Sequence, residues 1–247
     1  MRSLAVLLLL TLALAGCSNP FSGVGGVEPR DLVSASDYRS WLIEVDHSAG
    51  ARPDDALLEF VKGRLHSVVQ KDSIEFRIDE AIGTDAGHAW GDAEAQSFAN
   101  DHKGQSTSGD RVVTHLVFLT GHSDHDTGEG KVLGVSFGHS LIVIYSDSVT
   151  HACDPGVVPV FRTCNPSDIF RSVVVHEYGH ALGLVNNGAP MQQAHEDTAP
   201  EHRRHSSNDR SVMYWAVEAS NGLPLFGANA PPTDFDEDDR ADLRALQ

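Results

Sequence analysis

The segment HEYGHALG, residues 176–183, constrains this chain more than any other stretch of its sequence. Residues four positions apart lie on the same face of a helix, so His176 and His180 can reach one metal ion. Glu177 stands beside them and could take a proton from water at that ion. Catalytic zinc takes three protein ligands and leaves a fourth position open. The segment therefore predicts a zinc-binding helix that needs a third ligand from another part of the chain.

The residues before this segment carry helix-start signals and an apolar stripe. Asn165 can cap the helix, and Pro166 suits its first turn. Ile169, Val173 and the two histidines follow one another at spacings of four, three and four residues, which places them on one inward face. Gly183 has no Cβ and can end the helix in a left-handed turn. We therefore expect both histidines at the buried end of this helix.

Apolar residues elsewhere follow both helical and strand periods. Their patterns predict helices at 55–70, 92–102 and 234–246, and strands at 41–45, 74–78, 112–120 and within 132–146. Strands dominate the first half of the chain, ahead of the zinc-binding helix. This order fits an α+β domain with a mixed, mostly parallel sheet.

HEYGHALG resembles the zinc-helix motif of the metzincin metalloproteases, His-Glu-x-x-His-x-x-Gly. In that family the third ligand is a histidine six residues after the second, where this chain has Asn186, and a Met-turn lies under the metal. The segment SVMYW supplies Met213 for such a turn. Archaemetzincin-like sequences run third-ligand His, Cys, four residues, Cys, any residue, Met. The stretch from His205 to Met213 has this spacing, with Ser206 and Ser211 in the places of the cysteines.

The resemblance implies that His205 is the third zinc ligand and that a loop of about twenty residues has been inserted after Gly183. The entropic cost of closing a longer loop grows slowly with its length, so the loop can return a distant ligand to the metal. The match is close over residues 169–218, and LGLVNNGAPM followed by MYWAVE looks like a group of bacterial zinc-dependent proteases. Other candidates for the third ligand stay open: His195, His202, Asp197 and Asn186.

The function implied by the resemblance is that of a zinc-dependent endopeptidase with a metzincin-like, or zincin-like, fold. Glu177 would be the general base for water that attacks a peptide carbonyl. A peptide or protein substrate would lie along an edge strand, formed by 132–137 or by 140–145. Two alternatives stay open. Asn186 motivates a lipoprotein that binds metal without catalysis, and a zinc hydrolase could instead cleave a peptidoglycan amide.

The first residues, MRSLAVLLLLTLALAGCSNP, predict an export signal. Arg2 precedes an apolar run too short to span a bilayer, and Leu-Ala-Gly directly before Cys17 resembles a bacterial lipobox. We expect a lipoprotein signal peptide at 1–16, a flexible tether at 17–30 and a zincin-like metalloprotease domain at 31–247. Lipid on Cys17 would anchor the protein to a membrane of the bacterial cell envelope, facing the periplasm or the exterior.

The charge, the cysteines and two polar segments give further expectations about binding and structure. Acidic residues number 35 against 18 lysines and arginines, which argues against a nucleic-acid partner. Cys153 and Cys164 are a pair in a chain expected to be exported, which favours a disulfide over free thiols or a metal site. The polar loop 122–130 and the acidic segment 234–246 are interpreted as solvated surface rather than as metal sites.

Overall fold

A computed structural model of the chain describes residues 26–247, except for 80, 86, 129, 155–163 and 227–228. The expected signal peptide and most of the expected tether therefore lie outside the described residues. The first helix, α1 (Pro29–Val33), begins two residues before the expected start of the domain. Within the described part of the chain, no helix has the length and apolarity needed to cross a bilayer.

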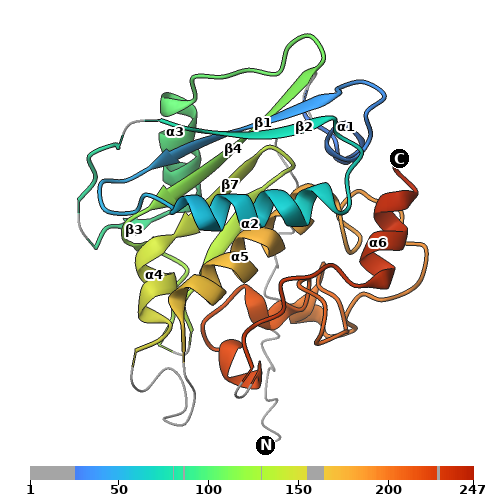
Figure 1. The fold of residues 1–247 in the computed structure, drawn as a ribbon. Coiled ribbons are helices and arrows are strands. Elements are labelled where there is room, and N and C mark those ends of the chain that lie inside the picture. Colours follow the sequence, from blue (N-terminus) through green and yellow to red (C-terminus); the bar gives the residue numbers. More distant parts are fainter. Residues whose placement is uncertain (1–25, 80, 86, 129, 155–163, 227–228) are drawn as a thin grey trace, which may run out of the picture.

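A five-stranded sheet in the order β2-β1-β4-β7-β6 forms the centre of the fold (Figure 1). Its first four strands in this order run parallel, and β6 is antiparallel to β7. The mixed, mostly parallel sheet expected from the sequence is therefore present, with β6 at one edge. The strands are β1 (Ser40–His47), β2 (Ser73–Ile78), β4 (Arg111–Leu119), β6 (Gly134–Phe137) and β7 (Leu141–Tyr145).

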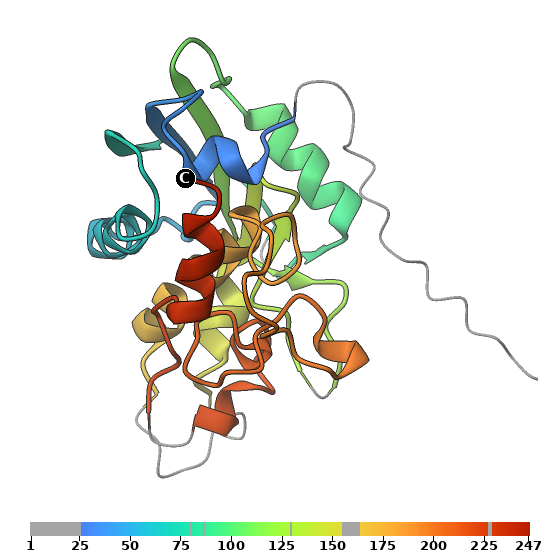
Figure 2. The ribbon, with the colours of Figure 1, turned by 90° about the vertical axis from the view of Figure 1, so that its right-hand side faces the viewer.

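Helices cover both faces of this sheet. α2 (Asp55–His66) and α5 (Pro166–Ala181) pack on one face, and α3 (Asp92–His102) covers the other (Figure 2). Each helix turns an apolar stripe to the sheet, and burial of apolar surface contributes about 25 cal/mol per Å². In α2 this stripe consists of Leu57, Leu58, Val61 and Leu65.

Shorter elements complete the chain. β3 (Ala89–Trp90) pairs with β5 (His122–Ser123), so the segment expected as a polar loop begins with a short strand. The part of the chain after α5 contains little regular structure and lies against that helix and the sheet end (Figure 1). The remaining elements are α4 (Ser146–His151), η1 (Pro200–His202), η2 (Trp215–Val217), η3 (Leu223–Phe226) and α6 (Glu237–Arg244).

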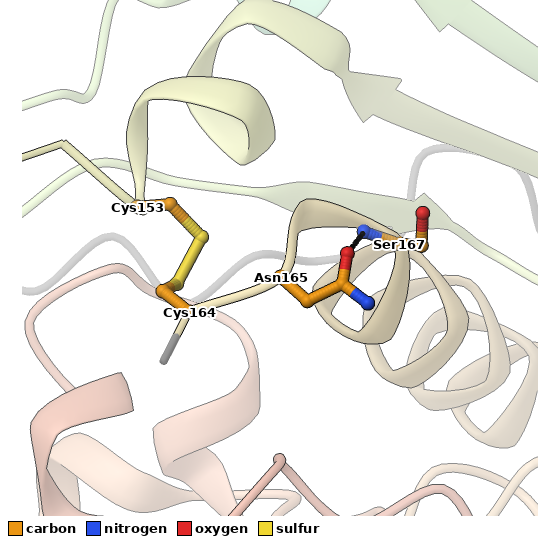
Figure 3. Close-up of a disulfide and its surroundings, with 4 residues drawn as sticks. All are labelled: Cys153, Cys164, Asn165 and Ser167. Carbon is orange, nitrogen blue, oxygen red and sulfur yellow. Dashed lines mark hydrogen bonds between the residues drawn. A yellow bond between two sulfur atoms is a disulfide. The ribbon is translucent and has the colours of Figure 1, made fainter. Parts of the chain in front are cut away.

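The start of α5 is fixed by the cap and the disulfide that the sequence predicts (Figure 3). The side chain of Asn165 accepts a hydrogen bond from the backbone N–H of Ser167 at 3.1 Å, and Pro166 occupies the first turn. The disulfide joins Cys153, just after α4, to Cys164, just before the cap. α5 is thereby held at its N-terminal end, and its other end carries the two histidines.

Candidate metal centre

α5 directs two imidazoles toward one point. The Nε2 atoms of His176 and His180, one helical turn apart, are separated by 3.1 Å. The backbone carbonyl of Val212 lies 2.6 Å from Nδ1 of His176. Because that carbonyl can only accept, Nδ1 carries the proton and Nε2 presents its lone pair to the centre. Burial, and secondarily the imidazole of His205, lowers the pKa of His176 to about 4, so the ring is neutral, as a metal ligand must be.

His205 reaches the same point from the loop that follows α5. Its ring centroid lies 5.2 Å from that of His176 and 5.0 Å from that of His180. Backbone hydrogen bonds hold this part of the loop, because Asp197 N–H donates to the His205 carbonyl at 2.8 Å. Burial and the two neighbouring imidazoles also lower the pKa of His180 well below its ordinary value. The three imidazoles expected from the sequence are therefore brought together, and burial keeps those of His176 and His180 neutral.

Glu218, which the sequence did not suggest, completes this cluster. Its Oε2 lies 2.7 Å from Nε2 of His205, and one donor atom from each of the four residues lies within 4.8 Å of the others. The Leu133 N–H donates to the Glu218 carbonyl at 3.0 Å, which ties the end of η2 to the residue before β6. The carboxylate side chain is 38% exposed, so it lies on the solvent side of the cluster. Its only signal in the sequence is its position five residues after Met213.

Glu177 lies next to the cluster on α5 and is buried. Its Oε1 has no hydrogen-bond partner among the described residues. Burial, and secondarily the charge of Glu218, raises the pKa of Glu177 well above its ordinary value. A buried polar atom without a partner costs about 1–3 kcal/mol, and such atoms in native proteins often have a functional role. The Oε1 atom is therefore both buried and unpaired among the described residues.

Met213 packs directly against the turn of α5 that carries the two histidines. A Cβ built on Gly179 would lie 2.1 Å from Sδ of Met213, so the helix needs glycine here for the methionine to approach. Met213 is fully buried, and its carbonyl accepts a hydrogen bond from Ser206 N–H at 2.8 Å. The same residue therefore contacts α5 and holds the backbone next to His205.

The other candidates for the third ligand lie elsewhere. Asn186 has a left-handed backbone with a φ of 61°, and its side-chain amide donates to Glu196 at 3.3 Å. His195 contacts carboxylates of α6 instead of the imidazole cluster. Nδ1 of His202 lies 3.1 Å from Asp197, at the surface. Within the described residues, the imidazoles of 176 and 180 thus share a donor cluster with His205 and with none of these alternatives.

The polar loop 122–130 and His139 lie outside the imidazole cluster. In the polar loop, His125 is 62% exposed and lies 3.3 Å from Asp92, and Lys131 pairs with Asp126 at 3.1 Å. The pair of His125 lies at the surface, whereas Asp126 is only 10% exposed and also accepts from Val132 N–H at 2.9 Å, so this part of the loop is less solvated than expected. Nδ1 of His139 lies 3.0 Å from the carbonyl of Ala181, so it caps the last turn of α5.

Comparison with solved structures relates the fold to a known one. The chain is similar to the crystal structure of archaemetzincin from Methanopyrus kandleri, with a TM-score of 0.50 and 13% sequence identity. The likeness covers 85% of this chain and 96% of that one. The fold is archaemetzincin-like. At this identity the likeness describes the fold, so the chemistry of the site depends on its own geometry. No protein-family model and no curated protein sequence matches the chain.

Proposed function

We propose that this chain is a zinc-dependent peptidase in which His176, His180 and His205 bind the metal. The observation that carries the proposal is the convergence of three imidazoles beside a buried carboxylate with an unpaired oxygen. Three nitrogen donors are the protein ligand set of many catalytic zinc sites. The hydrogen bond that fixes Nδ1 of His176 to a backbone carbonyl is the outer contact usual for such ligands. The donor chemistry therefore fits zinc.

Glu177 is the general base in this proposal. Zinc held by the three imidazoles would supply a lowered pKa for water and polarisation of the substrate carbonyl. Glu177 takes the proton as water attacks that carbonyl, and it then gives the proton to the leaving amine. Its free Oε1 supports the first step, and the effect of burial on its pKa favours return of the proton in the second.

In this proposal Met213 is the methionine of the Met-turn that the metzincin resemblance implies. Its burial against Gly179 supports this assignment, because the side chain lies under the helical turn that carries both histidines. A methionine in this place supports the ligand helix and does not need to donate to the metal.

We propose that an extended peptide adds to the free edge of β6. Of the two candidate strands, 140–145 contains β7, which is paired on both sides, whereas 132–137 contains β6, which is at the edge of the sheet. A Cβ built on Gly134 would lie 3.0 Å from Cγ of Glu177, so β6 begins directly beside the proposed base. A strand added to β6 would bring its carbonyl groups to this region by ordinary sheet hydrogen bonds.

Glu218 favours a second candidate function, a metal-binding protein without catalysis. A fourth protein donor would close the coordination position that water and substrate need, and closed four-donor sites are typical of structural zinc. The 2.7 Å contact between Glu218 and His205 makes this the main competitor of the peptidase.

Metal content and peptide cleavage separate the two functions. We expect wild-type protein to bind zinc and cleave members of a broad peptide library. The Glu177→Gln variant should keep its zinc and lose about 100-fold or more of the cleavage rate, as expected for loss of a general base. Glu218→Gln is the matched control, since it removes the same charge on the other side of the cluster and should still cleave. Zinc binding without cleavage in both wild type and Glu218→Gln would contradict the peptidase.

We also propose that lipid on Cys17 anchors the protein in the cell envelope. This proposal rests on the lipobox-like sequence before Cys17. Radiolabelled fatty acid should label wild-type protein in a bacterial host and should not label Cys17→Ala. Equal labelling of both proteins would contradict the anchor.

A further inference from the structure

A second cluster of donors lies between the loop after α5 and the C-terminal helix α6. His195 in the loop is 4% exposed, and Asp239 and Asp242 on α6 are fully buried. Nε2 of His195 lies 2.9 Å from Oδ2 of Asp242, which is a hydrogen-bond distance. The other ring nitrogen, Nδ1, faces Oδ1 of Asp239 at 3.8 Å, which is too long for a hydrogen bond. Asp236, at the N-cap of α6, is the third member of the cluster.

Two buried atoms that face one another are thus left without partners. Neither Nδ1 of His195 nor Oδ1 of Asp239 has a hydrogen-bond partner among the described residues. The second oxygen of Asp239 accepts from Ser211 Oγ at 2.6 Å and from Asp236 N–H at 3.0 Å, so the carboxylate is held in place. Leaving two polar atoms buried and unpaired is costly, and atoms in this state need an explanation.

The separation of these two atoms suits two ligands of one ion. Nitrogen and oxygen ligands lie about 2.0–2.2 Å from zinc, so two of them are about 3.4–3.8 Å apart at angles of about 110–130°. The bond from Nε2 to Asp242 is the outer carboxylate contact that metal-binding histidines usually make. A donor set with an imidazole and carboxylates suits zinc better than calcium or magnesium, which prefer oxygen alone.

Charge around the cluster also favours a cation. Three carboxylates meet one imidazole, and burial, as the largest cause, raises the pKa of Asp239 to about 7. The arginines of α6 are engaged elsewhere: Arg240 donates to the Phe235 carbonyl at 3.0 Å, and Arg244 pairs with Glu237 at 2.6 Å. Positive charge for the cluster is therefore not supplied by these side chains.

We propose that His195, Asp239 and Asp236 hold a second divalent ion, zinc by their donor chemistry, with a structural role. Asp239 accepts from Ser211 Oγ, which in turn accepts from Met213 N–H at 2.9 Å. The carbonyl of His195 accepts from Ser207 N–H at 2.8 Å. The ion would thus join α6 to the segment between His205 and Met213, through Ser207 near its start and Ser211 near its end. This site is separate from the proposed catalytic centre and does not depend on the chain being a peptidase.

Zinc stoichiometry tests the proposal directly. Calorimetric titration of metal-free wild-type protein with zinc chloride should give two equivalents per chain. Asp239→Asn, which keeps the shape of the side chain, should give one. Asp238→Asn is the matched control, because it removes one charge from the same turn of α6 outside the cluster, and it should give two. Equal stoichiometry in the two variants would overturn the proposal.

A second measurement covers the case in which Asp239→Asn does not fold. The double variant His180→Ala/His205→Ala removes two imidazoles of the first site and leaves the second cluster unchanged. It should retain one zinc equivalent, and zinc should raise its melting temperature. A double variant that folds, as judged by circular dichroism, and binds no zinc would show that His195 is only an ion-paired histidine between carboxylates. Peptide cleavage by wild type is scored separately, so failure of the peptidase proposal would be distinguishable.

Discussion

Replacing Gly179 by alanine tests how closely Met213 is packed under the helix that carries the histidines. Gly179 and Gly63 both lie inside helices, so alanine should gain about 1 kcal/mol of helix propensity at either position. A Cβ on Gly63 meets no atom within 4 Å. A Cβ on Gly179 would instead lie 2.1 Å from Sδ of Met213 and 3.2 Å from Cε1 of Phe235. Alanine therefore has free space at position 63, whereas at position 179 its methyl group would clash with Met213.

The magnitude follows from the packing. Met213 and Phe235 are 0% and 2% exposed, so neither side chain can move into solvent. Insertion of a methyl group into a packed core costs about 1–3 kcal/mol, which offsets or exceeds the gain in helix propensity of about 1 kcal/mol. Gly179→Ala should therefore change the unfolding free energy by between about zero and a loss of 2 kcal/mol. Gly63→Ala should raise it by about 1 kcal/mol.

A displaced Met213 should also disturb the metal ligands. Its carbonyl holds Ser206 next to His205, and the carbonyl of the preceding residue, Val212, holds His176. Loss of such outer contacts lowers metal affinity by about 10- to 100-fold, so we expect zinc affinity to fall in Gly179→Ala and stay unchanged in Gly63→Ala.

Urea denaturation of the metal-free proteins and zinc competition with a chelator measure both effects. If Gly179→Ala were as stable as Gly63→Ala and bound zinc as tightly as wild type, the close approach of Met213 to α5 would be refuted.

The remaining predictions concern single contacts. His205→Ala should weaken zinc binding by more than about 100-fold, beyond the effect of losing an outer contact, while His202→Ala should leave it unchanged; equal affinities in a chelator competition would remove His205 from the site. Thr114→Val should lower the unfolding free energy by about 1–3 kcal/mol, because it leaves the buried Nε1–H of Trp41, now 2.8 Å from Thr114 Oγ1, without an acceptor, and Thr114→Ser in the same urea assay should not. Burial lowers the pKa of His176 from 6.5 to about 4 in the folded chain, so the unfolded state binds more protons in this window and the metal-free protein should lose stability as pH falls from 6.5 to 4. That loss should be smaller in His176→Gln, and parallel curves of unfolding free energy against pH would contradict the assignment. Reduction of the disulfide, whose cysteines are 11 residues apart, should lower the unfolding free energy by about 3 kcal/mol, with a Cys153→Ser/Cys164→Ser variant insensitive to reductant as the control.

Local pattern was enough to predict the elements that surround the site. The helix at 92–102 and the capped helix that starts after Asn165 follow from spacing and from capping chemistry, which act within a few residues. The pairing of strands does not follow from such signals. That 132–137 forms the edge and 141–145 the interior of the sheet depends on contacts with strands distant in sequence.

The composition of the metal cluster shows the same limit. The two histidines on one helical turn form a local pattern. His205 could be predicted only because its spacing to Met213 resembles that of archaemetzincin-like sequences. Glu218 has no motif of its own, and it reaches the cluster because η2 is tied to the residue before β6. The partnership of His195 with α6 is likewise a long-range contact, across 47 residues to Asp242.

The backbone after α5 shows why residue 186 does not reach the proposed metal site. Gly183 has a φ of 87°, and Val185 and Asn186 have φ values of 50° and 61°, so the chain makes a left-handed turn just where a histidine ligand would be expected. A Cβ at Gly183 would lie 2.7 Å from the backbone nitrogen of Ala189, which shows how tightly this turn closes. With the side chain of Asn186 bound to Glu196, residue 186 points its donor to the loop and not to the metal. In the proposed site, a residue from later in the chain, His205, takes the place of the third ligand. The added loop length costs little closure entropy, and the contacts of the loop with α6 offset that cost. On this reasoning the buried contact of His195 with α6 anchors the long loop that would present His205 to the proposed metal.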